Sequence, residues 1–182
     1  MVVTRVAGSF VFPADFMLVA AMNPCPCGFY PDRSRCNCSE SEIRRYLHRI
    51  SRPVLERFDI CVEAAPVTFE ELRGGGESEA SAAIRQRVEL VRKIQEKRFE
   101  GTGIRFNSRM GAKEIKRFCR LEPEEEAFVK KIYDARGLSA RRYHKTLKVA
   151  RTISDLAGKA RIQREHLAEA LGYSLLEEKL WG

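Results

Sequence analysis

The sequence predicts an α/β fragment at residues 1–65 followed by a mainly α-helical bundle. Three observations lead to this fold class. Continuous apolar runs at residues 16–22 and 60–64 are typical of buried strands, two Cys-x-Cys pairs between them indicate a metal knuckle, and apolar residues recur at helical spacing from residue 79 to the end. We therefore expect a first domain at residues 1–65, a linker at 66–78 and a helical domain at 79–182.

The first apolar run, FMLVAAM, does not alternate between apolar and polar residues, which is typical of a strand covered on both faces in a parallel sheet. Pro24 cannot donate a backbone hydrogen bond, so the strand is expected to end at Asn23. Ligands bind at the carboxyl ends of strands in open α/β sheets, which makes Asn23 a candidate binding residue. A turn-forming asparagine is the alternative.

The paired cysteines are the strongest local signal. Cys25 and Cys27 are separated by eight residues from Cys36 and Cys38, and four thiolates in two close pairs can surround one Zn²⁺ tetrahedrally. The metal would hold together a loop that has little apolar content of its own. Because the spacing is shorter than C-x₂-C, free thiols, disulfides or an iron–sulfur cluster remain alternatives. Four protein ligands leave no open position, so a structural site is predicted.

A helix is predicted after the knuckle, because Ser39 and Glu42 have the spacing of a capping box and apolar residues follow at helical spacing. Pro53 ends this helix, and Arg57 then leads to the second apolar run, residues 60–64. Ahead of the first run, residues 2–12 predict a β-hairpin that turns at Ala7-Gly8. The order of the first domain is therefore hairpin, strand, metal loop, helix and strand.

The rest of the chain has helical periodicity. Residues 66–78 are typical of a linker, since they contain a proline, a short turn and three consecutive glycines. Ser139 is the expected N-cap of the longest helix, which Gly158 ends, and a shorter helix is expected around Ile115. The other predicted helices cover residues 81–99, 124–136 and 163–171. Their apolar stripes are interpreted as core.

Several long motifs resemble the carboxyl-terminal part of magnesium-chelatase-like AAA+ ATPases of the ComM/YifB type. They are AAMNPCPCG, the paired cysteines, RRYLHRISRPVLERFDI and LSARRYHKTLKVARTISDLAG. They follow the family's order and cover nearly the whole chain. The resemblance implies that residues 1–65 are the end of an AAA+ core and that residues 79–182 are the helical lid.

The resemblance also implies three catalytic residues. The strand-end asparagine of the family is sensor 1, the arginine of the LERFD element resembles the arginine finger, and the arginine of SARxxH resembles sensor 2. These correspond to Asn23, Arg57 and Arg141, of which Asn23 and Arg141 would also contact the nucleotide. Arg52 stands where the family usually has a small residue, so Arg49 and Arg52 are alternatives to Arg57.

These groups suit phosphoryl transfer, in which catalysis is positioning and electrostatic stabilisation of the charge on the transferred group. Asn23 can orient a water molecule without adding charge, and Arg141 can reach the phosphates from the lid. In the resembled family Arg57 would face the nucleotide of a neighbouring subunit, where its guanidinium can donate two hydrogen bonds. A homo-oligomeric ring, expected to be a hexamer, is therefore the implied assembly.

Charge points to a polyanionic partner. The net charge is +8, and nine basic residues but only one acidic residue lie between Arg136 and Arg164. This imbalance is typical of contact with nucleotide phosphates or a nucleic-acid backbone, and a solvated helical face is the alternative. The resemblance would place the hairpin at a central pore, with Arg5 near DNA.

The sequence contains no G-x-x-x-x-G-K-[ST] motif and no apolar strand ending in paired acidic residues. ATP and Mg²⁺ are therefore expected to bind mainly to an amino-terminal part outside this sequence, and this fragment should be inactive alone. The predicted whole is a ring-forming, DNA-translocating ATPase, a branch-migration helicase of recombination or natural transformation. The alternatives are a chelatase-like chaperone ATPase acting on a protein partner and a zinc-knuckle binding module.

A cytoplasmic location is predicted. No stretch approaches the ~20 apolar residues of a membrane span, the first residues do not form a signal peptide, and no membrane partner is expected. Six cysteines in a chain without an export signal favour a reducing compartment and metal binding.

Overall fold

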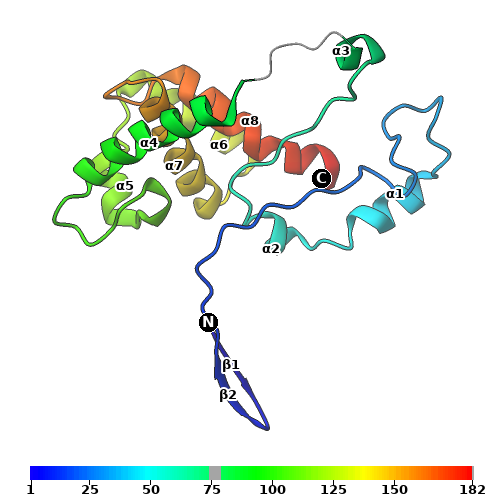
Figure 1. The fold of residues 1–182 in the computed structure, drawn as a ribbon, viewed down its shortest axis with the longest axis horizontal. Coiled ribbons are helices and arrows are strands. Elements are labelled where there is room, and N and C mark those ends of the chain that lie inside the picture. The colour runs from blue at the N-terminus through cyan, green and yellow to red at the C-terminus, as the bar shows by residue number, and fades with distance from the viewer. Residues whose placement is uncertain (74–78, 182) are drawn as a thin grey trace. The chain divides into compact units, whose positions relative to one another are not determined.

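The computed structural model describes residues 1–73 and 79–181, apart from the side chains of Arg52, Glu71 and residues 174–181. Residues 74–78 of the predicted linker thus lie outside the described part. The chain divides into two units, Met1–Leu47 and His48–Gly182, whose helices and strands are labelled in Figure 1. Each unit is described by itself.

The first unit begins with the predicted hairpin. Strands β1 (Val2–Arg5) and β2 (Gly8–Val11) pair antiparallel, with Val2 opposite Val11 and Arg5 opposite Gly8. The turn therefore consists of Val6 and Ala7, one residue earlier than predicted. Gly8 has a φ of 137°, a backbone conformation that favours glycine.

Neither of the two predicted core strands is present in this structure. Residues 16–22 are not in a strand, and the side chains of Phe16, Met17 and Val19 are 73%, 88% and 81% exposed. Residues 60–64 are not in a strand either, and the amide of Cys61 donates to the carbonyl of Tyr173 at 3.2 Å. A parallel strand forms only against a neighbour that takes up its backbone hydrogen bonds, and within the described residues the only two strands pair with each other. In the described part of the chain, β structure is limited to the hairpin.

Helix α1 (Glu40–Leu47) completes the first unit and confirms the capping box. The Ser39 amide donates to Glu42 Oε2 at 2.9 Å, and the Glu42 amide donates to Ser39 Oγ at 3.3 Å. Ile43 and Leu47 are buried on one face of the helix. The cap fixes the start of α1 directly after Cys38 and so links the helix to the cysteine loop.

The second unit is a helical bundle arranged around α7. Helix α7 packs against α4, α5, α8 and a short 3₁₀ turn, η1, and Figure 1 shows it beside α8. The elements are α2 (Arg52–Leu55), α3 (Phe69–Arg73), α4 (Ser81–Arg98), η1 (Asn107–Arg109), α5 (Ala112–Phe118), α6 (Pro123–Arg136), α7 (Ala140–Leu156) and α8 (Arg164–Trp181). The predicted helices of this part are confirmed, and α8 continues past its predicted end at residue 171.

The apolar core of the bundle comes from α4 to α8 and the loops between them. It consists of Phe99, Met110, Ile115, Cys119, Val129, Leu147, Ala150, Ile162, Leu167 and Ala170. The stripe on α4 is only partly core: Val91 is buried, but Ile84, Val88 and Ile94 are 42%, 40% and 43% exposed. The interpretation of every apolar stripe as core is therefore wrong for this side of α4.

Local signals set the ends of α6 and α7. Pro123 occupies the first turn of α6, and Gly137 ends that helix with a φ of 57°. The Ser139 hydroxyl accepts the amide of Arg142 at 3.2 Å and caps α7 as predicted. This cap places Arg141 in the first turn of α7.

Polar side chains fasten α7 to α4 and η1. Asp155 of α7 accepts hydrogen bonds from Arg98 of α4, from Asn107 of η1 and from Arg151 one turn earlier, and its side chain is fully buried. The Oδ1 atom of Asn107 also accepts a hydrogen bond from Arg98 Nη1 at 2.9 Å. The one acid in the basic run is therefore an internal counter-ion for two arginines. Burial lowers the pKa of Arg151, and the Asp155 carboxylate opposes that shift.

Candidate metal centre and catalytic arginines

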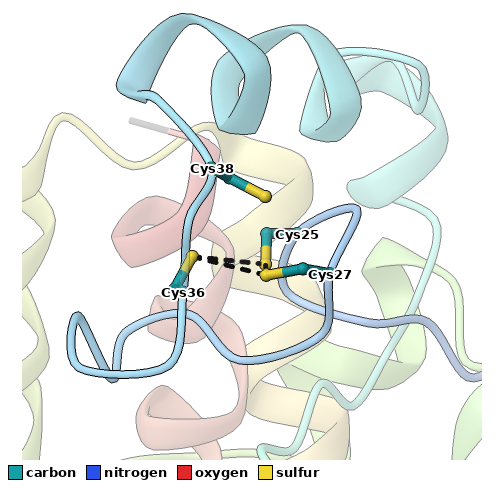
Figure 2. Close-up of side chains that lie close together, drawn as sticks. All are labelled: Cys25, Cys27, Cys36 and Cys38. Carbon is teal, nitrogen blue, oxygen red and sulfur yellow. Dashed lines mark hydrogen bonds between the residues drawn. The ribbon is translucent and has the colours of Figure 1, made fainter.

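The four cysteines of the two pairs converge on one point. Figure 2 shows their side chains turned towards one another. The Sγ atom of Cys25 is 3.3 Å from that of Cys27 and 3.8 Å from that of Cys36, and the Sγ atoms of Cys27 and Cys36 are 3.6 Å apart. All four sulfur atoms, including that of Cys38, lie within 4.8 Å of one another, and all are free thiols.

This geometry fits a tetrahedral metal. Zn–S bonds of about 2.3 Å place the sulfur atoms of a Zn(Cys)₄ centre about 3.8 Å apart, close to the separations observed here. Cys25 and Cys36 are buried, whereas Cys27 is exposed, so the centre would lie at the edge of the unit. Zinc would crosslink the two ends of the cysteine loop, and the four donors would be Cys25, Cys27, Cys36 and Cys38.

The thiols are electrostatically distinct. Burial acts to raise the pKa of Cys25, but hydrogen bonds from the Tyr30 amide, at 3.4 Å, and from the neighbouring thiols lower it to about 6. The pKa of Cys38 is raised to about 12, because burial and the other thiols outweigh a hydrogen bond from the Cys27 backbone. The pKa values of the two thiols are therefore shifted in opposite directions by their surroundings.

Two arginines lie on the cysteine loop. Arg33 donates to the Cys38 carbonyl at 3.1 Å and pairs with Glu40 of α1, and the Arg35 guanidinium lies 4.1 Å from the centre of the Phe29 ring. The bonds of Arg33 join the end of the loop to the first turn of α1. Compensation of a negative metal centre by these two arginines stays a prediction.

Asn23 lies at the entrance of this loop. Its side chain is exposed, and a Cβ atom added to Gly28 would meet Asn23 Nδ2 at 3.6 Å. Gly28 has a φ of 85°, so a side chain there would strain the backbone. The structure therefore places Asn23 against the cysteine loop rather than at the end of a strand.

Arg57 and Arg141 both belong to the helical unit, and both are exposed. The Nη1 atom of Arg57 donates to the Pro53 carbonyl at 2.6 Å, so its guanidinium is folded back on α2. Arg49 is also exposed, and the side chain of Arg52 lies outside the described part. The choice among the three candidate fingers stays a prediction.

Lys145 joins the segment of Arg57 to the helix of Arg141. Its ammonium donates to the carbonyl of Phe58 at 2.6 Å and to that of Glu56 at 3.4 Å. Lys145 is only 8% exposed. The sequence analysis included Lys145 among the basic residues expected to contact a polyanion. The structure instead directs its ammonium to a turn far away along the chain, a contact that no local sequence pattern indicates.

Some of the basic residues between Arg136 and Arg164 are buried and others are exposed. Arg142, Lys145 and Arg151 are buried, Lys148 donates to the Ser108 carbonyl at 3.1 Å, and Arg161 pairs with Glu122 at 2.6 Å. The surface available to a polyanion is therefore smaller than the sequence indicated. Arg5 is exposed at the end of β1, where it faces Gly8 across the hairpin.

Within the described residues, no helix combines the length and the apolar character needed to cross a bilayer.

Comparison with known proteins identifies the class to which these features belong. Residues 1–72 match the family described as magnesium chelatase, subunit ChlI, and residues 78–174 match its C-terminal family, magnesium chelatase, subunit ChlI C-terminal. The chain therefore belongs to the magnesium chelatase ChlI family, a chelatase-like group of AAA+ ATPases. The boundary between the two matches falls within the predicted linker.

Two curated relatives show which members of this family the chain is similar to. The chain is 42% identical over 174 residues to the competence protein ComM of Haemophilus influenzae, an alignment that covers 95% of this chain and 33% of ComM. It is 37% identical over 180 residues to the uncharacterized protein YifB of Escherichia coli, covering 97% of this chain and 34% of YifB. The chain thus spans about a third of the length of these relatives.

Proposed function

We propose that this chain is the carboxyl-terminal part of a ring-forming, ATP-hydrolysing AAA+ motor that translocates DNA, such as a branch-migration helicase of recombination or natural transformation. One observation carries the proposal: Arg57 and Arg141, which match the finger and sensor 2 motifs, are exposed in one unit and connected through Lys145. Similarity to ComM, a protein named for competence, supports the biological setting.

In this proposal ATP and Mg²⁺ bind mainly to the part of the motor outside this chain. Asn23 orients the attacking water, Arg141 contacts the phosphates, and Arg57 donates to the nucleotide of a neighbouring subunit. Zinc at the four cysteines shapes the loop that carries Asn23 and takes no part in the chemistry. Arg5 on the hairpin contacts the DNA backbone.

The test is ATP hydrolysis by the full-length protein with and without DNA. We expect Arg57→Ala and Arg141→Ala each to lower kcat by roughly 10³-fold, the scale of an arginine that stabilises the transferred phosphoryl group. Arg87→Ala is the matched control, because Arg87 is an exposed arginine of α4 that pairs with Glu79, a residue just before that helix. Equal activity of all four proteins would overturn the catalytic assignment.

A chelatase-like chaperone ATPase acting on a protein partner is the second candidate. The observation that favours it is the burial of Arg142, Lys145 and Arg151, which reduces the basic surface. The two functions differ in their response to DNA and salt. A DNA motor should bind DNA with an affinity that falls steeply between 50 and 200 mM salt, by roughly 10³-fold for about six phosphate contacts, whereas the chaperone should not bind at low salt.

A further inference from the structure

Lys145 is an unusual residue for the interior of a helical bundle. Buried ammonium groups are normally paired with a carboxylate, because removal of a charge from water is costly. Among the described residues, the hydrogen-bond acceptors of Lys145 are two backbone carbonyls, those of Phe58 and Glu56. Both acceptors flank Arg57. The ammonium of Lys145 therefore binds one short stretch of backbone, the turn around Arg57.

That stretch is short, and its own hydrogen bonds are local. Helix α2 has four residues, and a helix of this length is not stable by itself. Beyond α2, the amides of Arg57 and Phe58 donate back to the carbonyls of Val54 and Leu55 at 3.0 and 2.9 Å. These local bonds shape the turn but do not orient it on the bundle. Among the described residues, its anchors on the bundle include the buried side chain of Leu55 and the ammonium of Lys145, and the amide of Cys61 donates to the carbonyl of Tyr173 a few residues further on.

The position of Lys145 on α7 relates the turn to Arg141. Lys145 follows Arg141 by four residues, so the buried lysine and the exposed arginine are neighbours one turn apart on the helix. The ammonium thus connects the backbone around Arg57 to the part of α7 next to Arg141. The Lys145 ammonium is therefore a direct contact between α7 and the turn that carries Arg57.

We infer that Lys145 is a positioning residue, which holds the turn of Arg57 so that the finger and Arg141 keep a fixed relation while the motor hydrolyses ATP. This inference rests on the proposed function. A charged group must be placed accurately to stabilise a transition state, and a displacement of about 1 Å can cost roughly a hundredfold in rate. Lys145 therefore acts through Arg57 and does not touch the nucleotide.

Lys148 provides a matched control on the same helix. It also donates from Nζ to a backbone carbonyl, that of Ser108 at 3.1 Å, but its acceptor belongs to η1 and not to the turn of Arg57. Substitution of either lysine by methionine keeps the unbranched side chain and removes the ammonium. A general effect of losing a lysine from α7 would appear in both variants.

The experiment uses the full-length protein and measures ATP hydrolysis for Lys145→Met, Lys145→Arg, Lys148→Met, Arg57→Ala and the double variant Lys145→Met/Arg57→Ala. We expect Lys145→Met to lower kcat roughly ten- to a hundredfold with little change in KM, and Lys145→Arg to restore most of it. Lys148→Met should keep the wild-type kcat. The double variant should be no slower than Arg57→Ala, because a residue that acts through Arg57 adds nothing once Arg57 is absent.

Hydrogen exchange of residues 54–59 gives a second readout that does not depend on activity. These amides should exchange faster in Lys145→Met and remain unchanged in Lys148→Met. A wild-type kcat in Lys145→Met, or additive losses in the double variant, would overturn the role of Lys145 alone. A wild-type protein without ATPase activity would overturn the proposed function itself, and the role of Lys145 with it.

Discussion

Asp155 shows how a single buried residue can connect three elements. Its carboxylate accepts from Arg98, Asn107 and Arg151, so its removal would leave two guanidinium groups in the interior without their counter-ion. We expect Asp155→Ala to lower the free energy of opening of α7 by about 3–5 kcal/mol. Native-state hydrogen exchange of the α7 amides measures this quantity.

Glu122→Ala is the control for this prediction. Glu122 also pairs with an arginine, Arg161, but both side chains are exposed, and such a pair contributes less than about 1 kcal/mol. If Asp155→Ala and Glu122→Ala changed the exchange of α7 equally, the buried carboxylate would have no special role.

At the residue scale, the metal centre can be tested by measuring the zinc content of the purified protein. We expect the purified protein to contain one zinc per chain, and Cys25→Ser to lose it, because a Zn(Cys)₄ site requires all four donors. Elemental analysis measures the metal content. Cys119→Ser should keep the zinc, since Cys119 belongs to the apolar core of the helical unit, where burial raises the pKa of its thiol to about 11. Zinc retained by Cys25→Ser would argue against the four-cysteine site.

Among the elements, the end of α6 offers a test of backbone conformation. Gly137 has a φ of 57°, and a Cβ atom added there would meet no neighbour within 4 Å, so any cost of Gly137→Ala is conformational. We expect that substitution to destabilise α6 by about 1 kcal/mol. The free energy of opening of the α6 amides, from hydrogen exchange, is the measurement.

Gly172→Ala is the opposite case. Gly172 lies within α8, where an added Cβ atom again meets nothing within 4 Å, and alanine favours a helix over glycine by about 1 kcal/mol. The two substitutions should therefore shift stability in opposite directions. The same sign for both would mean that side-chain packing, and not the backbone, determines the effect.

Elements defined by local signals could be predicted from the sequence. The capping box at Ser39, the N-cap at Ser139 and the glycine end of α6 are confirmed because each depends on neighbouring residues. The apolar runs at 16–22 and 60–64 could not be placed in this way. A continuous apolar run indicates burial, but a strand also needs a partner, and the sequence of the run does not show whether one is present.

The candidate site was predictable to different degrees. Spacing was sufficient to bring the four cysteines together, because they lie within one short loop. Lys145 was missed because its acceptors are 87 and 89 residues away, and a backbone carbonyl has no sequence signature. Arg151 and Asp155, four residues apart, had the spacing of an intrahelical ion pair and could have been removed from the basic run.

For the whole molecule, the proposed function predicts that the exposed run at residues 16–22 behaves differently in this chain and in a full-length motor. In the isolated segment we expect fast hydrogen exchange at these amides and no ATP hydrolysis. In the full-length protein we expect the same amides to be protected, because burial of Phe16, Met17 and Val19 against the remaining core is favourable at about 25 cal/mol per Å². Fast exchange in both would mean that this run is not a core strand.

The compactness of the cysteine cluster has a consequence for biosynthesis. All four sulfur donors occur between positions 25 and 38, so capture of a metal closes a short loop and requires no residue further along the chain. If these cysteines bind zinc, as predicted, the knuckle would be completed on the ribosome soon after Cys38 emerges, before the helical unit has been made. A synthetic peptide of residues 20–50 should accordingly bind Co²⁺ with the absorption spectrum of tetrahedral thiolate coordination, and a featureless titration would show that the donors need the rest of the protein to assemble.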